Sequence, residues 1–376
     1  MKIAFITPGF SADESDWCIP VLLNLVREMA REHEIHVFTL RYPHRQSRYS
    51  VHGAAVHAFG GAARAGMSRF PLLAHALTAM RAEARRRPFD VVHGFWADEP
   101  GFLAALAGRV LRIPAIVSLM GGELVGFPEL GYGGQLSTIN WILTRLAIRS
   151  STKITVGSHY FGAIARPSIP DEKLHELPLG VDAQHFHPHA QPTSLFPADK
   201  VNLLHVASLV PIKDQATLLH AFALSSHEFP EIHLYLAGEG PLRPTLEQLA
   251  NDLEISSRIT FHGSVSHDHL PDYYRAADLC VLSSRFESQG MVVLEAAACG
   301  VTTVGTAVGI LPELVPAELL APVGAAESLA RAISRLAGDS ARRKEAGREI
   351  YARVRGEFSL EKTVARLLDL YQSRYV

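Results

Sequence analysis

The chain has 376 residues, of which 48% are hydrophobic and 20% charged, and its formal net charge is −2. This length favours about two domains, and the composition is typical of a globular chain that builds two cores. No apolar run reaches the roughly 18 residues of a membrane span, and three widely spaced cysteines favour a reducing compartment over a disulfide framework. We therefore expect a cytoplasmic protein.

The first half of the sequence alternates between short apolar runs and amphipathic segments. Its predicted strands cover residues 2–7, 35–40, 91–93, 115–119 and 153–156. Its predicted helices cover residues 21–31, 68–87, 101–111 and 135–150. This alternation is typical of a mostly parallel sheet with helices on both faces.

A stretch rich in histidine and proline, residues 185–192, interrupts the alternation and is interpreted as a linker. Further strands are predicted over residues 202–207, 232–237, 259–262, 279–282 and 302–305, with helices beginning near residues 214 and 242. Two α/β halves joined by a linker predict a ligand cleft between them.

Residues 283–300 bear most directly on function. A predicted strand ends at residue 282, Gly290 permits a tight turn, and a helix is predicted over 291–299 with Gly300 at its end. Backbone amides at the start of a helix attract anions, so this loop predicts an anion site. Glu287 lies in the loop and Glu295 in the second helical turn, so both can line one crevice. The alternative is a buried strand–helix unit whose Glu295 is a charge on the helix face.

Charge is spread unevenly, because residues 41–87 hold nine arginines and one acid, Glu83. One interpretation is a solvated helix face with loops, and the other is contact with anionic lipid or an anionic acceptor. The helix predicted over 68–87 also carries five large apolar side chains, which either lie on the inner face of a membrane or face the domain core. They are Phe70, Leu72, Leu73, Leu77 and Met80. The slightly negative net charge, without aromatic residues interleaved among bases, argues against nucleic acid.

An ordered set of motifs in the second half resembles the retaining glycosyltransferases of family 4, the group 1 glycosyltransferases. The matching segments are 178–182 (PLGVD) with Phe186, 211–213 (PIK), 238–241 (GEGP), 274–278 (YRAAD), 287–295 and 312–313 (PE). The first half is similar more loosely, through 90–93 (DVVH) and 122–123 (GE). The resemblance implies an α/β GT-B fold, in which two Rossmann-like domains face each other across a cleft.

The resemblance also implies domain boundaries and a biosynthetic role. Residues 1–182 would form the acceptor domain, joined by a C-terminal helix at about 358–376, and residues 183–357 would bind the nucleotide sugar. The implied enzyme transfers a hexosyl group from a nucleoside-diphosphate sugar to a glycan, lipid or small-molecule acceptor, in polysaccharide or glycoconjugate biosynthesis. It would use neither cofactor nor bound metal.

Transfer from a nucleoside-diphosphate sugar builds positive charge on the sugar and negative charge on the departing diphosphate, so preorganised cations and amides aimed there matter most. Lys213 and Glu287 are the predicted catalytic residues, and Glu295 is suited to the ribose hydroxyls. The predicted donor-binding residues are Ser208, Lys213, Gln289, Gly290, Met291, Val292 and Glu295. The predicted acceptor-side residues are Gly9, His93 and Glu123.

Three departures from the family pattern affect the expected activity. Ala207 and Ser208 replace the usual Gly-Arg, Met120 replaces a usual histidine, and a single Gly9 replaces a Gly-Gly loop. A neutral Ser208 supplies less stabilisation of the leaving group than arginine would. The alternatives are therefore a nucleotide-sugar-binding protein or partner subunit with little turnover, and a nucleotide-sugar epimerase. His185, His187 and His189 alternate, but no carboxylate or cysteine lies near them at metal-ligand spacing.

Overall fold

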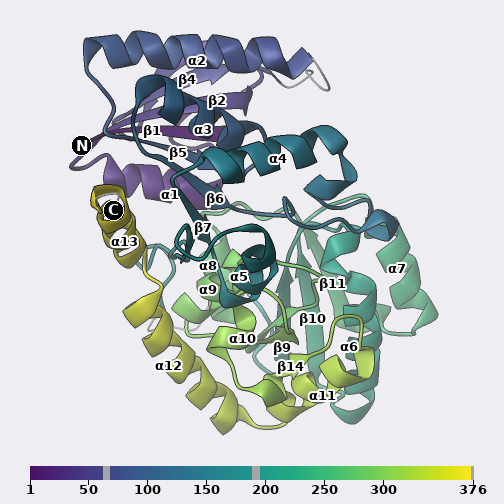
Figure 1. Ribbon diagram of the computed structural model, residues 1–376. Coiled ribbons are helices and arrows are strands. Elements are labelled where there is room, and N and C mark those ends of the chain that lie inside the picture. The colour runs from purple at the N-terminus through teal and green to yellow at the C-terminus, as the bar shows by residue number, and fades with distance from the viewer. Residues whose placement is uncertain (62–67, 189–194, 374–376) are drawn as a thin grey trace. The chain divides into compact units, whose positions relative to one another are not determined.

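A computed structural model describes residues 1–61, 68–188 and 195–373 (Figure 1). Contacts within the chain divide it into two compact units. Unit 1 comprises Met1–Leu179 and Leu360–Val376, and unit 2 comprises Gly180–Ser359. The C-terminal helix α13 (Leu360–Gln372) therefore belongs to the unit formed by the first half of the chain. The sequence had suggested the break after residue 182 and the helix from about 358.

Unit 1 is built on an eight-stranded sheet in the order β3-β4-β2-β1-β5-β6-β7-β8. Every neighbouring pair in this sheet is parallel except β3 with β4. The strands are β1 (Lys2–Gly9), β2 (Glu34–Tyr42), β3 (Gln46–Val51), β4 (Ala54–Phe59), β5 (Val91–Phe95), β6 (Ala115–Leu119), β7 (Lys153–Val156) and β8 (Leu174–Glu176). The central strands are buried on both faces, which explains their continuous apolar sequences.

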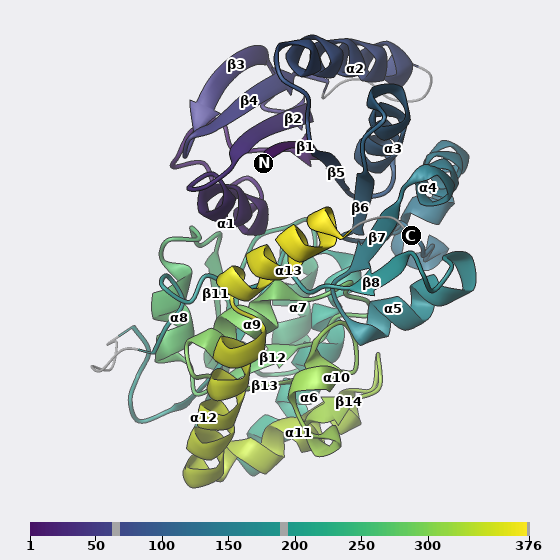
Figure 2. The same cartoon turned by 60° about the vertical axis from the view of Figure 1, so that its left-hand side comes forward.

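Helices cover both faces of this sheet. Figure 2 shows α2 and α3 on one side of it and α1 and α13 on the other. The helices are α1 (Pro20–Met29), α2 (Arg69–Arg86), α3 (Glu99–Leu111), α4 (Thr138–Ser150) and α5 (His159–Ala165), besides α13. Within the described residues, no helix is long and apolar enough to cross a membrane.

The β3–β4 hairpin was missed in the sequence, where residues 41–87 were interpreted as one helix with loops. Its two-residue turn consists of His52 (φ 46°) and Gly53 (φ 82°). Positive φ at both central residues is the type I′ form of this turn, and it explains the glycine. Alternating exposure along β3 then places every second side chain against the protein.

Unit 2 contains a parallel six-stranded sheet in the order β11-β10-β9-β12-β13-β14. The strands are β9 (Val201–Val206), β10 (Ile232–Ala237), β11 (Ile259–Gly263), β12 (Leu279–Leu282), β13 (Thr303–Thr306) and β14 (Leu320–Ala321). The helices are α6 (Gln215–Glu228), α7 (Arg243–Asp252), α8 (Leu270–Ala276), α9 (Met291–Ala298), α10 (Leu311–Leu314), α11 (Ala326–Ala337) and α12 (Ser340–Glu357). The order reverses between β9 and β12, and sheets of this kind bind ligands at such a switch point.

Candidate functional site

The loops that follow β9 and β12 meet at the switch point of unit 2. Lys213 Nζ lies 2.5 Å from Glu287 Oε1, joining the β9–α6 loop to the β12–α9 loop. Ser283 Oγ donates to the Lys213 carbonyl at 2.8 Å, and Ser284 Oγ donates to Glu287 Oε1 at 2.7 Å. These bonds fix both charged side chains at the carboxyl ends of neighbouring strands. The sequence expected Lys213 and Glu287 to share a site, and the structure brings them together.

The ion pair is only partly enclosed. The Lys213 side chain is 26% exposed and that of Glu287 is 12% exposed. Lys213 ends a short 3₁₀ turn, and Asp214, with φ 48°, caps the N-terminus of α6 by accepting from the Thr217 amide. An ammonium group carries three donors, so Lys213 can bind an entering anion while it keeps Glu287.

The start of α9 presents backbone amides at the same loop. Gly290 is the N-cap with φ 88°, and no acidic residue occupies the first turn of the helix. The first amides of a helix have no partner within it, so those at 290–292 are available to an anion. The Gln289 carbonyl accepts from the Ile310 amide at 2.7 Å, which ties this loop to the one before α10.

Gln289 and Met291 contact each other, because Gln289 Nε2 lies 3.5 Å from Met291 Sδ. Gln289 is buried, whereas Met291 and Val292 are half-buried at the first turn of α9. These side chains border the backbone amides at 290–292, and the positive charge at the start of α9 comes from the backbone.

Glu295 is a buried carboxylate in the second turn of α9. Tyr274 Oη, on α8, donates to Glu295 Oε2 at 2.8 Å, and His267 Nε2 lies 3.9 Å from Glu295 Oε1. Burial raises the pKa of Glu295 to about 7. Glu295 is therefore not exposed to solvent, and its burial is compatible with both the predicted ribose contact and the alternative of a buried strand–helix unit. Tyr274 was noted in the sequence only as part of a motif, because contact between α8 and α9 could not be read from spacing.

Ser208 lies on the β9–α6 loop, which also carries Lys213. The residue is exposed, and its carbonyl accepts from Gln215 Nε2 at 3.0 Å. The neighbouring Gly238, with φ 148°, leaves no room for a side chain, because an added Cβ would lie 1.9 Å from the Ala207 carbonyl oxygen. The β9 and β10 loops thus pack backbone to backbone, which explains the Gly-Glu-Gly motif at 238–240.

His93 does not have the role expected of it. The residue is fully buried, its Nδ1 lies 2.6 Å from Tyr371 Oη and its Nε2 lies 2.8 Å from Ser118 Oγ. Burial also lowers the pKa of His93 to about 3. Both ring nitrogens are occupied, so His93 joins α13 to the sheet of unit 1 and does not contact an acceptor in this structure.

The buried carboxylate of Glu123 binds backbone amides at the strand ends of unit 1. Its carboxylate accepts from the amides of Met120 at 2.9 Å, Gly121 at 2.7 Å and Ala97 at 3.2 Å. The residue is buried, and burial raises its pKa. Gly9 is buried at the end of β1, where an added Cβ would lie 3.2 Å from Tyr42 Cβ. Both residues therefore support the surrounding loops.

Trp96 is the residue at these strand ends that the sequence analysis missed. It directly follows β5, is half-buried and has a φ of 70°. Positive φ is unusual for a bulky side chain, and such strain is concentrated at functional sites. Asp98 lies two residues further on, and burial raises its pKa. The sequence pattern shows no dihedral angle, so it gave no sign of this feature.

Most of the large apolar side chains of α2 belong to the core of unit 1. Leu72, Leu73 and Met80 are buried there and Leu77 packs against them, whereas Phe70 is 38% exposed. The apolar stripe is thus a core face, as the second interpretation held.

Several arginines of residues 41–87 pair with buried acids. Arg41 and Arg69 both contact Glu99, and Arg48 and Arg86 both contact Glu83. These pairs offset part of the charge excess counted along the sequence. Arg64 lies outside the described residues.

The histidines of the predicted linker contribute no cluster of metal ligands. Across the described part of the chain, no group of three or more His, Cys, Asp or Glu side chains is placed to hold a metal ion. His189 lies outside that part.

Comparison with known proteins agrees with this architecture. Two units that each carry a mostly parallel sheet are the architecture of the GT-B class of glycosyltransferases. A model named Glycosyltransferase Family 4 matches residues 20–185, and one named Glycosyl transferases group 1 matches residues 188–353. The chain belongs to this family of glycosyltransferases.

Individual relatives extend the comparison over nearly the whole chain. It is 27% identical over 357 residues to N-acetyl-alpha-D-glucosaminyl L-malate synthase of Bacillus anthracis, covering 91% of this chain and 89% of that one. Sucrose-phosphate synthase from Thermosynechococcus elongatus has a TM-score of 0.79 at 21% identity, covering 99% and 98%. Anabaena HepE, solved with UDP and glucose, has a TM-score of 0.77 at 20% identity and full coverage of both chains. At these identities the two structures establish the fold alone.

Proposed function

We propose that this glycosyltransferase is a retaining enzyme that transfers a hexosyl group from a nucleoside-diphosphate sugar to an acceptor hydroxyl. The observation that carries the proposal is the meeting of Lys213, Glu287 and the N-terminus of α9 at the switch point of unit 2. A lysine on one loop and the first amides of a helix on the neighbouring loop are suited to a diphosphate.

The departing diphosphate would be stabilised from two sides. Lys213 Nζ provides a full positive charge, and the amides at 290–292 provide the positive end of the α9 dipole. Both are held in place before the reaction, and preorganised groups of this kind act on charge that grows in the transition state. Ser208 adds a hydroxyl, so Lys213 carries the larger share.

The two glutamates would have separate tasks. Glu287, fixed by Lys213 and Ser284, would accept hydrogen bonds from the sugar hydroxyls and lie near the positive ring of the transition state. Glu295 would accept from the ribose hydroxyls. Tyr274 donates to Oε2, so the ribose would bind at Oε1, where His267 Nε2 lies 3.9 Å away.

The acceptor is assigned to the strand ends of unit 1. The strained Trp96 offers a ring platform, and Asp98 follows it on the same loop. Gly9 and Glu123 would support this loop region without contacting the acceptor. We further propose that transfer needs no bound metal, because Lys213 and the α9 amides provide the positive charge. Added EDTA should leave the rate unchanged, and a rate restored only by a divalent cation would contradict this.

Product analysis with a panel of nucleotide sugars tests the proposal. Transfer to an acceptor with retained anomeric configuration is the expected outcome. Binding without transfer would favour the alternative of a nucleotide-sugar-binding subunit, and an altered donor sugar without an acceptor would favour an epimerase. Inversion at the anomeric carbon would contradict the retaining mechanism.

A further inference from the structure

Unit 1 contains a groove that the proposed reaction does not use. It lies between the β3–β4 hairpin and α2 and has a volume of about 500 Å³. We call it the hairpin groove. The lining residues that matter are Gln46, Arg48, His57, Phe59 and His75.

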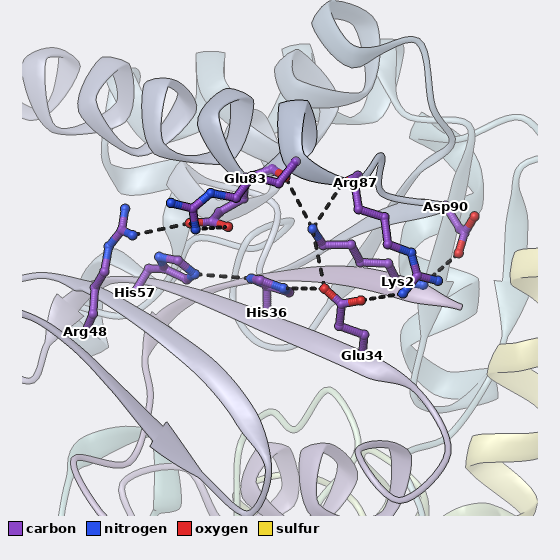
Figure 3. Close-up of polar contacts among 9 residues, drawn as sticks. Lys2, Glu34, His36, Arg48, His57, Glu83, Arg87 and Asp90 are labelled. Carbon is purple, nitrogen blue, oxygen red and sulfur yellow. Dashed lines mark hydrogen bonds and ion pairs between the residues drawn. The ribbon is translucent and has the colours of Figure 1, made fainter.

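One buried histidine in this groove has a ring nitrogen without a partner. His57 is 5% exposed, and its Nε2 lies 3.2 Å from His36 Nδ1. His36 Nε2 in turn lies 3.0 Å from Glu34 Oε1. Figure 3 shows the His57 ring between His36 and Arg48, with its second nitrogen on the side away from His36. That nitrogen, Nδ1, has no hydrogen-bond partner within the described residues.

The chain of contacts fixes which nitrogens carry protons. An ionised Glu34 can only accept, so His36 Nε2 donates to it, and the tautomer with its one ring proton there accepts at Nδ1. His57 must therefore donate from Nε2. Burial lowers the pKa of His57 to about 4, so its ring is neutral near pH 7. Nδ1 is left as a buried lone pair that requires an O–H or N–H donor.

The rest of the groove limits what that donor is. Phe59 and His75 form an edge-to-face ring pair with centroids 5.3 Å apart. Gln46 and Arg48 place an amide and a guanidinium at the mouth, and Arg48 binds Glu83, which offsets its charge. A ligand that fits this groove has a hydroxyl to donate to Nδ1, C–H groups to pack on the rings, and oxygens to accept from Gln46 and Arg48. A polyhydroxylated sugar ring has all three.

We propose that the hairpin groove is a carbohydrate subsite that holds one sugar unit with a hydroxyl donating to His57 Nδ1. His57 lines the groove and its Nδ1 is buried, so a neighbouring side chain must shift to admit the hydroxyl. Arg48 is 60% exposed and has the room to do so. The subsite lies in the unit that does not contain Lys213 and Glu287, so it goes beyond the proposed transfer site.

Nitrogen NMR on the full chain at pH 8 tests the first step. Long-range ¹H–¹⁵N spectra distinguish a protonated ring nitrogen from a bare one. We expect both His36 and His57 to carry the proton on Nε2. A proton on His57 Nδ1 would overturn the proposal, because the groove would then offer a donor.

Titration with methyl glycosides of glucose, mannose and N-acetylglucosamine tests the second step. At least one should shift the His57 Nδ1 resonance, and His57→Phe should weaken its binding about tenfold or more. This variant keeps the ring that stacks on Phe38 at 4.6 Å. The matched control is His262→Phe in unit 2, which removes another unpartnered ring nitrogen from a stacked imidazole and should leave glycoside binding unchanged.

The remaining outcomes separate this proposal from its competitors. Binding of inorganic phosphate in place of the glycosides would overturn it in favour of an anion site on Arg48. No shift with any glycoside would also overturn it, and would assign Nδ1 to an ordered water. Nucleoside-diphosphate binding by His57→Phe is measured alongside and should match the wild type. In the wild type, normal nucleotide binding without glycoside binding would reject the subsite alone, whereas glycoside binding without nucleotide binding would reject the proposed donor site alone.

Discussion

The two units each carry a carboxylate clamped by cations, and the two clamps differ in how completely they are closed. Glu99 in unit 1 is buried and receives Arg41 on both oxygens and Arg69 on one. Glu287 in unit 2 receives one lysine and one serine, and its cation stays partly exposed. A closed clamp has no capacity for a ligand, whereas an open one at a strand end has. Charge alone therefore does not distinguish a structural pair from a functional one.

Breaking the closed clamp should have the largest effect. Glu99→Ala leaves the guanidinium of the buried Arg69 without its carboxylate, and we expect a loss of about 3–5 kcal/mol in the free energy of unfolding. Urea unfolding measures it. A loss below about 1 kcal/mol, typical of exposed pairs, would show that the clamp is weaker than its geometry implies.

Opening the other clamp should affect turnover and leave the fold intact. Glu287→Ala should lower kcat by about 10²–10³, the range for removing one preorganised transition-state contact. Glu295→Ala should mainly raise KM for the donor. Steady-state kinetics read as free energies separate the two. An unchanged kcat with a raised KM in Glu287→Ala would remove its catalytic role.

Removing the cation should affect affinity. Lys213→Ala should weaken nucleoside-diphosphate binding by about 1.5–3 kcal/mol, the range for a hydrogen bond to a charged group. Calorimetry gives the number directly, with Lys200→Ala, an exposed lysine of the same unit, as the control. Equal affinities for Lys213→Ala and the wild type would place the diphosphate elsewhere.

The pH dependence of nucleotide binding tests the role of Glu295 in the site of unit 2. Burial raises the pKa of Glu295 from 4.5 to about 7, and only the ionised carboxylate accepts from both ribose hydroxyls. Affinity should therefore fall as the pH drops through about 7. Tyr274→Phe removes a hydrogen bond that lowers this pKa, so the midpoint should move to higher pH. An unchanged midpoint in Tyr274→Phe would show that Tyr274 does not affect the pKa of Glu295.

Stability should change in the opposite direction. The folded state holds the Glu295 proton more tightly than the unfolded chain, whose pKa is near 4.5. The Glu295 contribution to the free energy of unfolding should therefore fall as the pH rises from about 4.5 to 7. The difference in the free energy of unfolding between Glu295→Gln and the wild type, measured across this pH range, gives the contribution of Glu295.

The smallest effect is expected at a membrane surface. Leu72, Leu73 and Met80 are committed to the core, which leaves α2 with arginines and Phe70 outside. Co-sedimentation with anionic vesicles should be weak even at low salt. Strong binding that disappears at high salt would restore the peripheral-membrane interpretation.

The features that could be predicted from the sequence are those that depend on a local pattern of residues. Strands such as Ala115–Leu119 and Lys153–Val156 appear with the predicted bounds, because buried parallel strands are continuous apolar runs. Lys213 and Glu287 were expected at one strand-end site, whereas the ion pair between them was not predicted. The rest depended on contacts between distant segments, which no spacing encodes. The buried hydrogen bonds of His93 to Tyr371, and of Glu295 to Tyr274, are of this kind.

The central claim is that the open clamp of unit 2 binds the diphosphate of the donor. A crystal structure of the protein with the nucleoside diphosphate that binds most tightly tests it most directly. The account predicts phosphate oxygens within hydrogen-bond distance of Lys213 Nζ and of the amides at 290–292, with the ribose on Glu295. A diphosphate bound away from Lys213 and α9 would contradict it.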